Sequence, residues 1–167
     1  QLQLERYESG AREKRTASHH FSEMAEAGDL HFIGMKLRQS CTALLHKAVS
    51  EADLRLQLLA EVLAQVELQN LTQVPAVAVW YYGYRALSDV APKEWFGRLR
   101  EAMRAYAGQF PKEELRDVTM LAVNCCIRQI NTRQATGEQG YWLGQVFEIY
   151  QEGLDNQVFI ENGVLSR

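Results

Sequence analysis

The side chains best suited to chemistry are few, and none of them completes a catalytic motif. His19 and Glu23 are four residues apart, the spacing that places two zinc ligands on one face of a helix, but no third ligand accompanies them. Cys125 and Cys126 are adjacent in an apolar stretch, where a cysteine is more often part of a core than a nucleophile. We therefore expect no metal site, no cofactor and no catalytic residue, and predict that the chain is not an enzyme.

The acidic residues and the glycines support the same expectation. Glu113 and Glu114 are consecutive at the start of a predicted helix, where carboxylates complement the helix dipole. A catalytic acid and base would need two opposed environments, and nothing in the sequence suggests them. The motifs GxGxxG, GxxxxGK[ST] and GxSxG do not occur in the sequence.

Residues suited to binding are easier to find, and the first group is aromatic. Trp80, Tyr81, Tyr82 and Tyr84 lie within five residues of one another and are followed by Arg85. If their helix is buried all round, these side chains are structural. If it has one exposed side, Tyr81 and Tyr84 with Arg85 could line a peptide groove, because Tyr and Arg are enriched where proteins bind one another.

A second group forms a polar line on the predicted helix 111–132. Asp117, Asn124, Arg128 and Asn131 follow one another at spacings of seven, four and three residues, which places them on one face. Asn and Arg on such a face can bind a peptide backbone or a carboxylate. The alternative is an ordinary solvated helix face.

Composition indicates one soluble domain spanning residues 1–167. Hydrophobic residues make up 47% of the 167 and charged residues 23%, with a net charge of −3. The one local basic excess, Arg12, Lys14 and Arg15, includes Glu13, so nucleic acid is disfavoured as a partner. No apolar run approaches the roughly 18 residues that span a bilayer, so we expect no membrane contact.

The cysteines and the first residue bear on where the chain is found. Its three cysteines are an odd number without a CxxC motif, which favours reduced thiols and a cytoplasmic location. Because the chain starts at Gln1 instead of Met, we expect it to be a fragment of a longer protein.

Helical periodicity dominates the chain, and about seven helices are predicted. We expect a break at Gly28-Asp29, helix starts at Pro75, Pro92 and Pro111, and essentially no sheet. Val158–Ile160 is expected to begin a further element, whose unpaired apolar edge could form a homodimer. The predicted helices cover residues 3–27, 29–48, 51–68, 75–89, 92–107, 111–132 and 138–154.

An internal similarity indicates repeated helix pairs. Trp95-Phe96-Gly97 and Trp142-Leu143-Gly144 are 47 residues apart, each followed four residues after its glycine by a glutamate. A helix pair cannot bury its apolar face alone, and stacking a second pair completes the core. We expect each glycine to let a facing helix approach beside the indole.

Trp142-Leu143-Gly144, and Tyr82-Gly83 with Ala86, resemble the packing residues of tetratricopeptide-like helical repeat proteins. The resemblance implies an all-α fold in which antiparallel helix pairs stack as a solenoid with a concave surface, and it implies no activity. We therefore expect a protein-interaction or scaffold module that binds a protein or peptide through a groove lined by Tyr84, Asn124, Arg128 and Asn131. The alternatives are a purely structural domain of a larger protein, or a fragment of an enzyme whose active residues lie elsewhere.

Overall fold

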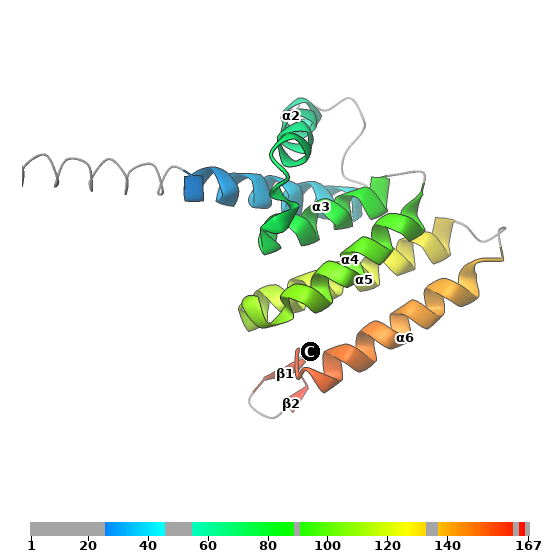
Figure 1. The fold of residues 1–167 in the computed structure, drawn as a ribbon. Coiled ribbons are helices and arrows are strands. Elements are labelled where there is room, and N and C mark those ends of the chain that lie inside the picture. The colour runs from blue at the N-terminus through cyan, green and yellow to red at the C-terminus, as the bar shows by residue number, and fades with distance from the viewer. Residues whose placement is uncertain (1–25, 46–54, 89–90, 133–136, 162–163, 166–167) are drawn as a thin grey trace, which may run out of the picture.

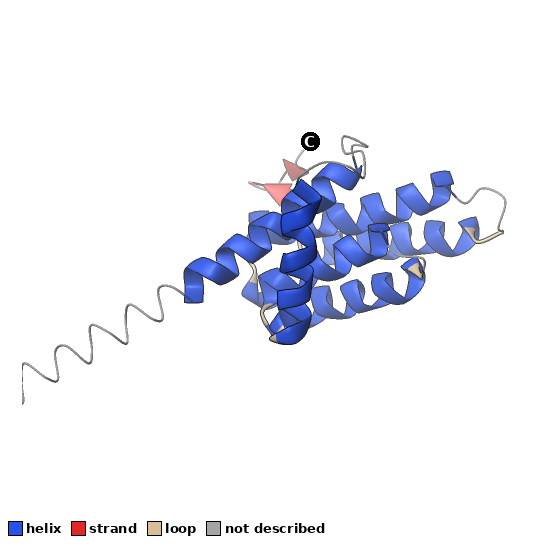
Figure 2. Ribbon diagram, turned by 90° about the horizontal axis from the view of Figure 1, so that it is seen from above, coloured by secondary structure: helices blue, strands red, loops and turns tan. Residues whose placement is uncertain are grey.

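The computed structural model describes residues 26–45, 55–88, 91–132, 137–161 and 164–165, and this part of the chain is almost entirely helical (Figures 1 and 2). The predicted all-α class is confirmed. The described residues form six α-helices instead of about seven, together with two two-residue strands. In chain order these elements are the helix over 26–45, α2 (Arg55–Leu68), α3 (Pro75–Ser88), α4 (Pro92–Tyr106), α5 (Lys112–Thr132), α6 (Gln139–Asp155), β1 (Ile160–Glu161) and β2 (Val164–Leu165).

Proline marks the helix starts as predicted, but glycine does not mark the first break. Pro75 and Pro92 are the first residues of α3 and α4, and Pro111 directly precedes α5. Residues 26–45 form one helix that passes through Gly28 and Asp29, so the predicted break there is wrong. A glycine inside a helix costs only about 1 kcal/mol, which packing later in the same helix can offset. Most of the predicted helix 3–27 lies outside the described residues.

The segment after α6 is a turn and a strand, where the sequence suggested a further apolar element. The N–H of Val158 donates to the carbonyl of Gly153, and Gln157 adopts a left-handed φ of 54°, so the chain reverses directly after the helix. β1 and β2 then pair antiparallel, with Ile160 opposite Leu165. Apart from this two-residue ribbon the described residues contain no sheet, which agrees with the prediction of essentially none.

Two helical hairpins form the body of the molecule. α3 packs against α4, α5 packs against α6, and the second hairpin lies alongside the first (Figure 1). Helix 26–45 contacts one helix of each hairpin, α3 and α5. The thiol of Cys41 donates to the carbonyl oxygen of Trp80 on α3 at 3.4 Å, and Arg38 forms an ion pair with Asp117 on α5 at 2.6 Å.

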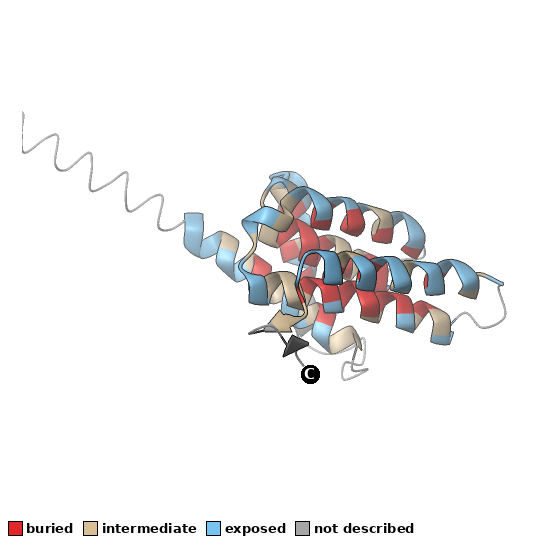
Figure 3. Ribbon diagram, turned by 90° about the horizontal axis from the view of Figure 1, so that it is seen from below, coloured by how far each residue is buried: buried red, intermediate tan, exposed pale blue. Residues whose placement is uncertain are grey.

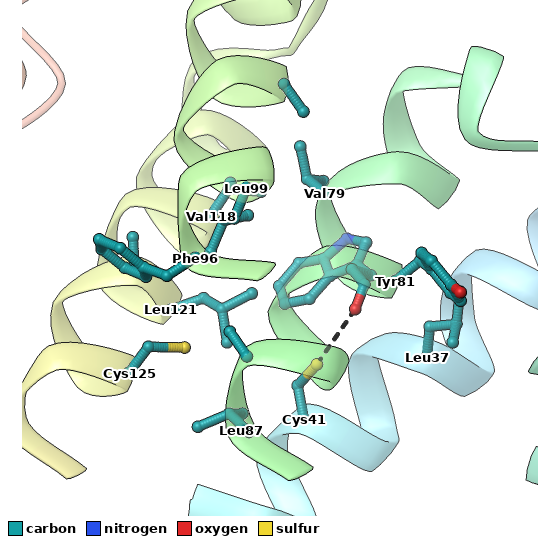
Figure 4. Close-up of a cluster of buried hydrophobic side chains, with 14 of the residues drawn as sticks. Leu37, Cys41, Val79, Tyr81, Leu87, Phe96, Leu99, Val118, Leu121 and Cys125 are labelled. Carbon is teal, nitrogen blue, oxygen red and sulfur yellow. Dashed lines mark hydrogen bonds between the residues drawn. The ribbon is translucent and has the colours of Figure 1, made fainter. Parts of the chain in front are cut away.

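The core lies where helix 26–45, α3, α4 and α5 meet. Figure 4 shows side chains from all four helices in one cluster, and Figure 3 shows buried residues on the inward sides of the helices. The labelled members are Leu37, Cys41, Val79, Tyr81, Leu87, Phe96, Leu99, Val118, Leu121 and Cys125. The helices therefore bury one apolar side each against their neighbours, as amphipathic helices do.

All three cysteines are buried free thiols, which confirms that they belong to the core. Burial raises the pKa of Cys41 and of Cys125 well above the ordinary range. Burial also raises the pKa of Cys126, to about 12. A thiolate is the reactive form of cysteine, so burial keeps these side chains in their unreactive form.

The two tryptophan segments do not occupy equivalent positions, so their residue-by-residue alignment is wrong. Phe96 is buried in α4 beside a half-buried Trp95, whereas Trp142 is buried in α6 beside an exposed Leu143. Neighbouring residues on a helix point about 100° apart, so the two helices bury positions that differ by one residue. Phe96 packs edge-on against Trp142, with ring centroids 5.3 Å apart.

The proposed packing role of the aligned glycines is also wrong. A Cβ atom added at Gly97 or at Gly144 would have no neighbouring atom within 4 Å. Gly83 is the glycine that permits a close approach, because a Cβ there would lie 2.5 Å from Cδ2 of Leu121 on α5. The tight contact between hairpins therefore involves α3 and α5.

Among the described residues, none of the helices combines the length and hydropathy that crossing a bilayer requires.

Candidate functional site

The first predicted binding residue, Tyr81, has its ring in the core. The side chain is 4% exposed, and its hydroxyl donates to Oε1 of Glu67 on α2 at 2.6 Å. Burial and this hydrogen bond to Glu67 raise the pKa of Tyr81 to about 12. Tyr81 therefore joins α3 to α2 and offers little surface to a partner. Tyr84, half-buried, packs against the same core.

Arg85 belongs to an aromatic cluster that includes a residue the sequence did not single out for binding. Its guanidinium lies 4.7 Å from the ring centroid of Trp95 on α4 and 3.8 Å from Oε1 of Glu67. Arg98 lies 4.8 Å from the same indole, and Tyr82 stacks on it with centroids 6.3 Å apart. Two arginines therefore flank one half-buried tryptophan, an arrangement that cation–π attraction stabilises.

The polar line on α5 is partly covered by the chain itself. Asp117 pairs with Arg38, and Arg128 donates to the main-chain carbonyl of Leu44 near the end of helix 26–45. Asn124 is half-buried and Asn131 is exposed. Arg128 therefore binds a main-chain carbonyl of another helix of its own chain.

The predicted residues thus belong to two sets of contacts. Tyr81 and Arg85 interact with Glu67 of α2, and Arg85 also with Trp95 of α4. Arg128 interacts with helix 26–45. The contacts of these residues bind helices of the chain to one another.

A small cavity lies where α4, α5 and α6 meet, and an ion triad lines it. Arg100, whose side chain is 5% exposed, pairs with Glu152 at 2.7 Å, and the exposed Arg104 pairs with the same carboxylate at 2.8 Å. Burial favours the neutral form of Glu152, but hydrogen bonds from Arg104 and Arg100 outweigh it and lower the pKa of the carboxyl.

The size of this cavity and its charges indicate a structural role. Its volume is about 50 Å³. Pockets that hold small ligands measure roughly 300–1,000 Å³. The cavity is therefore too small to hold a ligand of that size. The ion triad that lines it joins α4 to α6. Among the described residues, no group of three or more His, Cys, Asp or Glu side chains is placed to hold a metal ion.

Of the ten large apolar side chains that are exposed among the described residues, five lie on α6, which is at the edge of the helix stack in Figure 1. Seen from below, exposed residues run along the outer side of this helix (Figure 3). Four of them form a line that we call the α6 stripe, spaced four, three and four residues apart. Its members are Leu143, 47% exposed, Phe147, 72% exposed, Tyr150, 41% exposed, and Leu154, 43% exposed.

α6 therefore carries two apolar lines. The inner line faces the core and consists of Trp142, Val146, Ile149 and Gly153, at the same spacing of four, three and four. The α6 stripe lies about 100° away around the helix. An amphipathic helix at the surface of a protein needs only the inner line, so the stripe is additional apolar surface.

The spacing of the stripe is visible in the sequence, but sequence reasoning missed it. Trp142, Leu143 and Gly144 were interpreted as packing residues of a repeat, which treated Leu143 as buried. The two apolar lines have the same spacing, and each residue of the stripe directly follows one residue of the inner line. Either line could have faced the core, and the sequence does not distinguish them.

Polar groups border the stripe on one side. Glu148 accepts a hydrogen bond from Gln145 at 3.1 Å, and Asp155 accepts one from Gln151 at 2.9 Å. At the end of the helix, Phe159 packs against Tyr150 with ring centroids 5.7 Å apart. The surface is thus apolar along its length and acidic along one border.

Comparison with known proteins finds no matching family model, no matching curated protein and no matching solved structure.

Proposed function

We propose that this chain is a protein-interaction module that binds a helix of a partner protein along the outer side of α6. The α6 stripe carries this proposal. Four large apolar side chains in one line, each more than two-fifths exposed, form a surface that water solvates poorly. Covering such a surface is favourable, at about 25 cal/mol per Å² of apolar area removed from water.

The spacing of the stripe favours a helical partner. Side chains four, three and four residues apart form a nearly straight ridge about 16 Å long on α6. A second helix presents matching grooves at the same spacing, as in a coiled coil. An extended peptide would leave its backbone N–H and C=O groups against leucine and phenylalanine side chains, which offer no hydrogen bonds.

The fold supports the same function through its open edge. We infer that the two hairpins are stacked units of a tetratricopeptide-like solenoid. Gly83 against Leu121, Phe96 against Trp142, and Arg100 paired with Glu152 link one hairpin to the other. In such an array each helix pair covers the apolar side of its neighbour. The α6 stripe is then the apolar side of the second hairpin that faces away from the first.

The proposal replaces the groove expected on α3 and α5 with the surface of α6. Helix 26–45 packs against both α3 and α5, and its contacts use Asp117 of the polar line and Arg128 of the expected groove. In this proposal the chain binds and positions a protein partner, and it has no catalytic role.

A titration monitored by nuclear magnetic resonance tests the proposal. The ligand is an 18-residue synthetic helix with leucines at a four, three, four spacing and glutamines elsewhere, so that it carries no flanking charge. We expect its addition to shift the side-chain signals of Leu143 and Leu154. We expect Phe147→Ser to weaken binding about tenfold or more, since truncating a central aromatic contact costs about 2 kcal/mol.

Ile127→Ser is the matched control, because Ile127 is an exposed apolar residue on α5. It should leave the affinity unchanged. Binding that shifts signals elsewhere, or that Phe147→Ser leaves intact, would contradict the proposal. So would the absence of any shift at millimolar peptide.

A further inference from the structure

The charges of α6 are all of one sign. Its described residues include Glu148, Glu152 and Asp155 but neither lysine nor arginine. Glu152 is already paired with Arg100 and Arg104 of α4. Glu148 and Asp155 accept hydrogen bonds from neutral glutamines and form no salt bridge with a lysine or arginine of the described chain.

These two carboxylates form a line parallel to the stripe. Glu148 directly follows Phe147, Asp155 directly follows Leu154, and residues seven apart lie on the same face of a helix. Glu148 and Asp155 are both exposed. On the outer side of α6, the stripe therefore lies nearer the core and the line of carboxylates lies farther from it.

The surface between these two lines is open toward the start of α6. Helical geometry places Gly140, Gly144 and the exposed Gln151 between the stripe and the carboxylates, and a Cβ added at either glycine would meet no atom within 4 Å. A helix lying along this surface can approach the α6 backbone closely there. It would contact the stripe with one side and the carboxylates with the other.

We propose that the partner helix is a basic amphipathic one, whose apolar side covers the α6 stripe and whose lysines or arginines pair with Glu148 and Asp155. This inference rests on the proposed function and specifies the chemistry of its partner. Long basic side chains suit this position, because their methylene groups cover apolar surface while the charged ends reach a flanking carboxylate.

Charge also argues against a second copy of this chain as the occupant. Two α6 helices packed together would each bring a line of carboxylates, and α6 itself supplies no basic residue to balance them. Like charges brought together oppose association, and the net charge of −3 adds to this repulsion.

Two synthetic helices with the same leucine stripe test the inference, one flanked by lysines and the other by glutamates. At low ionic strength we expect the lysine peptide to bind about tenfold more tightly than the glutamate peptide. Each exposed ion pair contributes modestly, but attraction of the lysine peptide and repulsion of the glutamate peptide add. Raising the salt concentration to 0.5 M should reduce this difference, because salt screens exposed charges.

Charge reversal on α6 provides the matched variant. The double variant Glu148→Lys/Asp155→Lys should prefer the glutamate peptide. The control Glu61→Lys/Glu101→Lys changes the net charge by the same amount at exposed positions on α2 and α4. It should still bind the lysine peptide more tightly than the glutamate peptide.

The failures of the two proposals are distinguishable. If both peptides bind equally and Phe147→Ser weakens both, the basic partner is wrong and the interaction surface stands. If neither charged peptide nor the neutral peptide binds, both proposals are wrong. A concentration-dependent dimer in sedimentation that Phe147→Ser dissociates would identify a second copy as the occupant and overturn the inference.

Discussion

Leu121 of α5 packs directly over the Cα atom of Gly83 on α3. A Cβ at position 83 would lie 2.5 Å from Cδ2 and 3.3 Å from Cγ of this leucine, and both residues are buried. The separation of α3 and α5 in the core therefore depends on the absence of a side chain at this one position.

The first prediction follows from this contact. Gly83→Ala should reduce the free energy of unfolding by about 1–3 kcal/mol, the usual cost of overpacking a core. Gly97→Ala is the control, since it adds a methyl group to a helix interior where no atom lies within 4 Å. It should stabilise the protein by about 0.5–1 kcal/mol through helix propensity. Urea denaturation measures both changes, and equal effects would contradict the packing argument.

The contact of Arg128 with helix 26–45 makes a second prediction. Arg128→Met keeps the aliphatic part of the side chain but removes the hydrogen bond to the carbonyl of Leu44. We expect a loss of about 1.5–3 kcal/mol, the range for hydrogen bonds that involve a charged group. Amide hydrogen exchange should show faster exchange within residues 26–45, while Asn131→Ala, at an exposed position on the same helix, should change neither quantity. Unchanged protection in Arg128→Met would show that this contact does not hold the helix.

The ion triad predicts how stability depends on pH. The pKa of Glu152 is lower in the folded chain than in the unfolded chain, so the unfolded chain binds more protons between the two values. The stabilisation is therefore complete above the unfolded pKa of about 4.3 and is lost as the pH falls through the folded pKa.

Glu152→Gln tests this dependence by removing the charge. Its Arg100 partner would stay buried and unpaired, which costs about 3–5 kcal/mol for a fully buried pair. Because the Glu152 side chain is 37% exposed, we expect a smaller loss of about 1–2 kcal/mol at pH 7. The difference from wild type should shrink as the pH falls from 5 to 3. Glu101→Gln, exposed on α4, should show no such convergence.

The buried thiols predict slow chemistry in the native state. Burial raises the pKa values of Cys41, Cys125 and Cys126, so almost no thiolate is present at pH 8. A colorimetric disulfide reagent should label less than one thiol per chain within minutes under native conditions, and all three in guanidinium chloride. Fast labelling of the native protein would show that one of these cysteines is accessible.

Local patterns in the sequence were sufficient for the fold class and for most helix boundaries. Apolar residues at helical spacing predicted helices, and proline at the first turn marked the starts of α3 and α4, because both signals act within a few residues. Gly28 shows the limit of local signals. Its intrinsic cost is small, and the packing of Leu37 and Cys41 further along the same helix favours a continuous helix.

The exposed surface depends on contacts between residues distant in the chain. The sequence of α6 allows either of two apolar lines to face inward, and contacts such as that of Phe96 with Trp142 bury the inner one. The polar line on α5 likewise looks like a binding face until Arg38 and the end of helix 26–45 lie against it. Burial is a property of packed helices, so a single helix cannot show which of its apolar sides will remain in water.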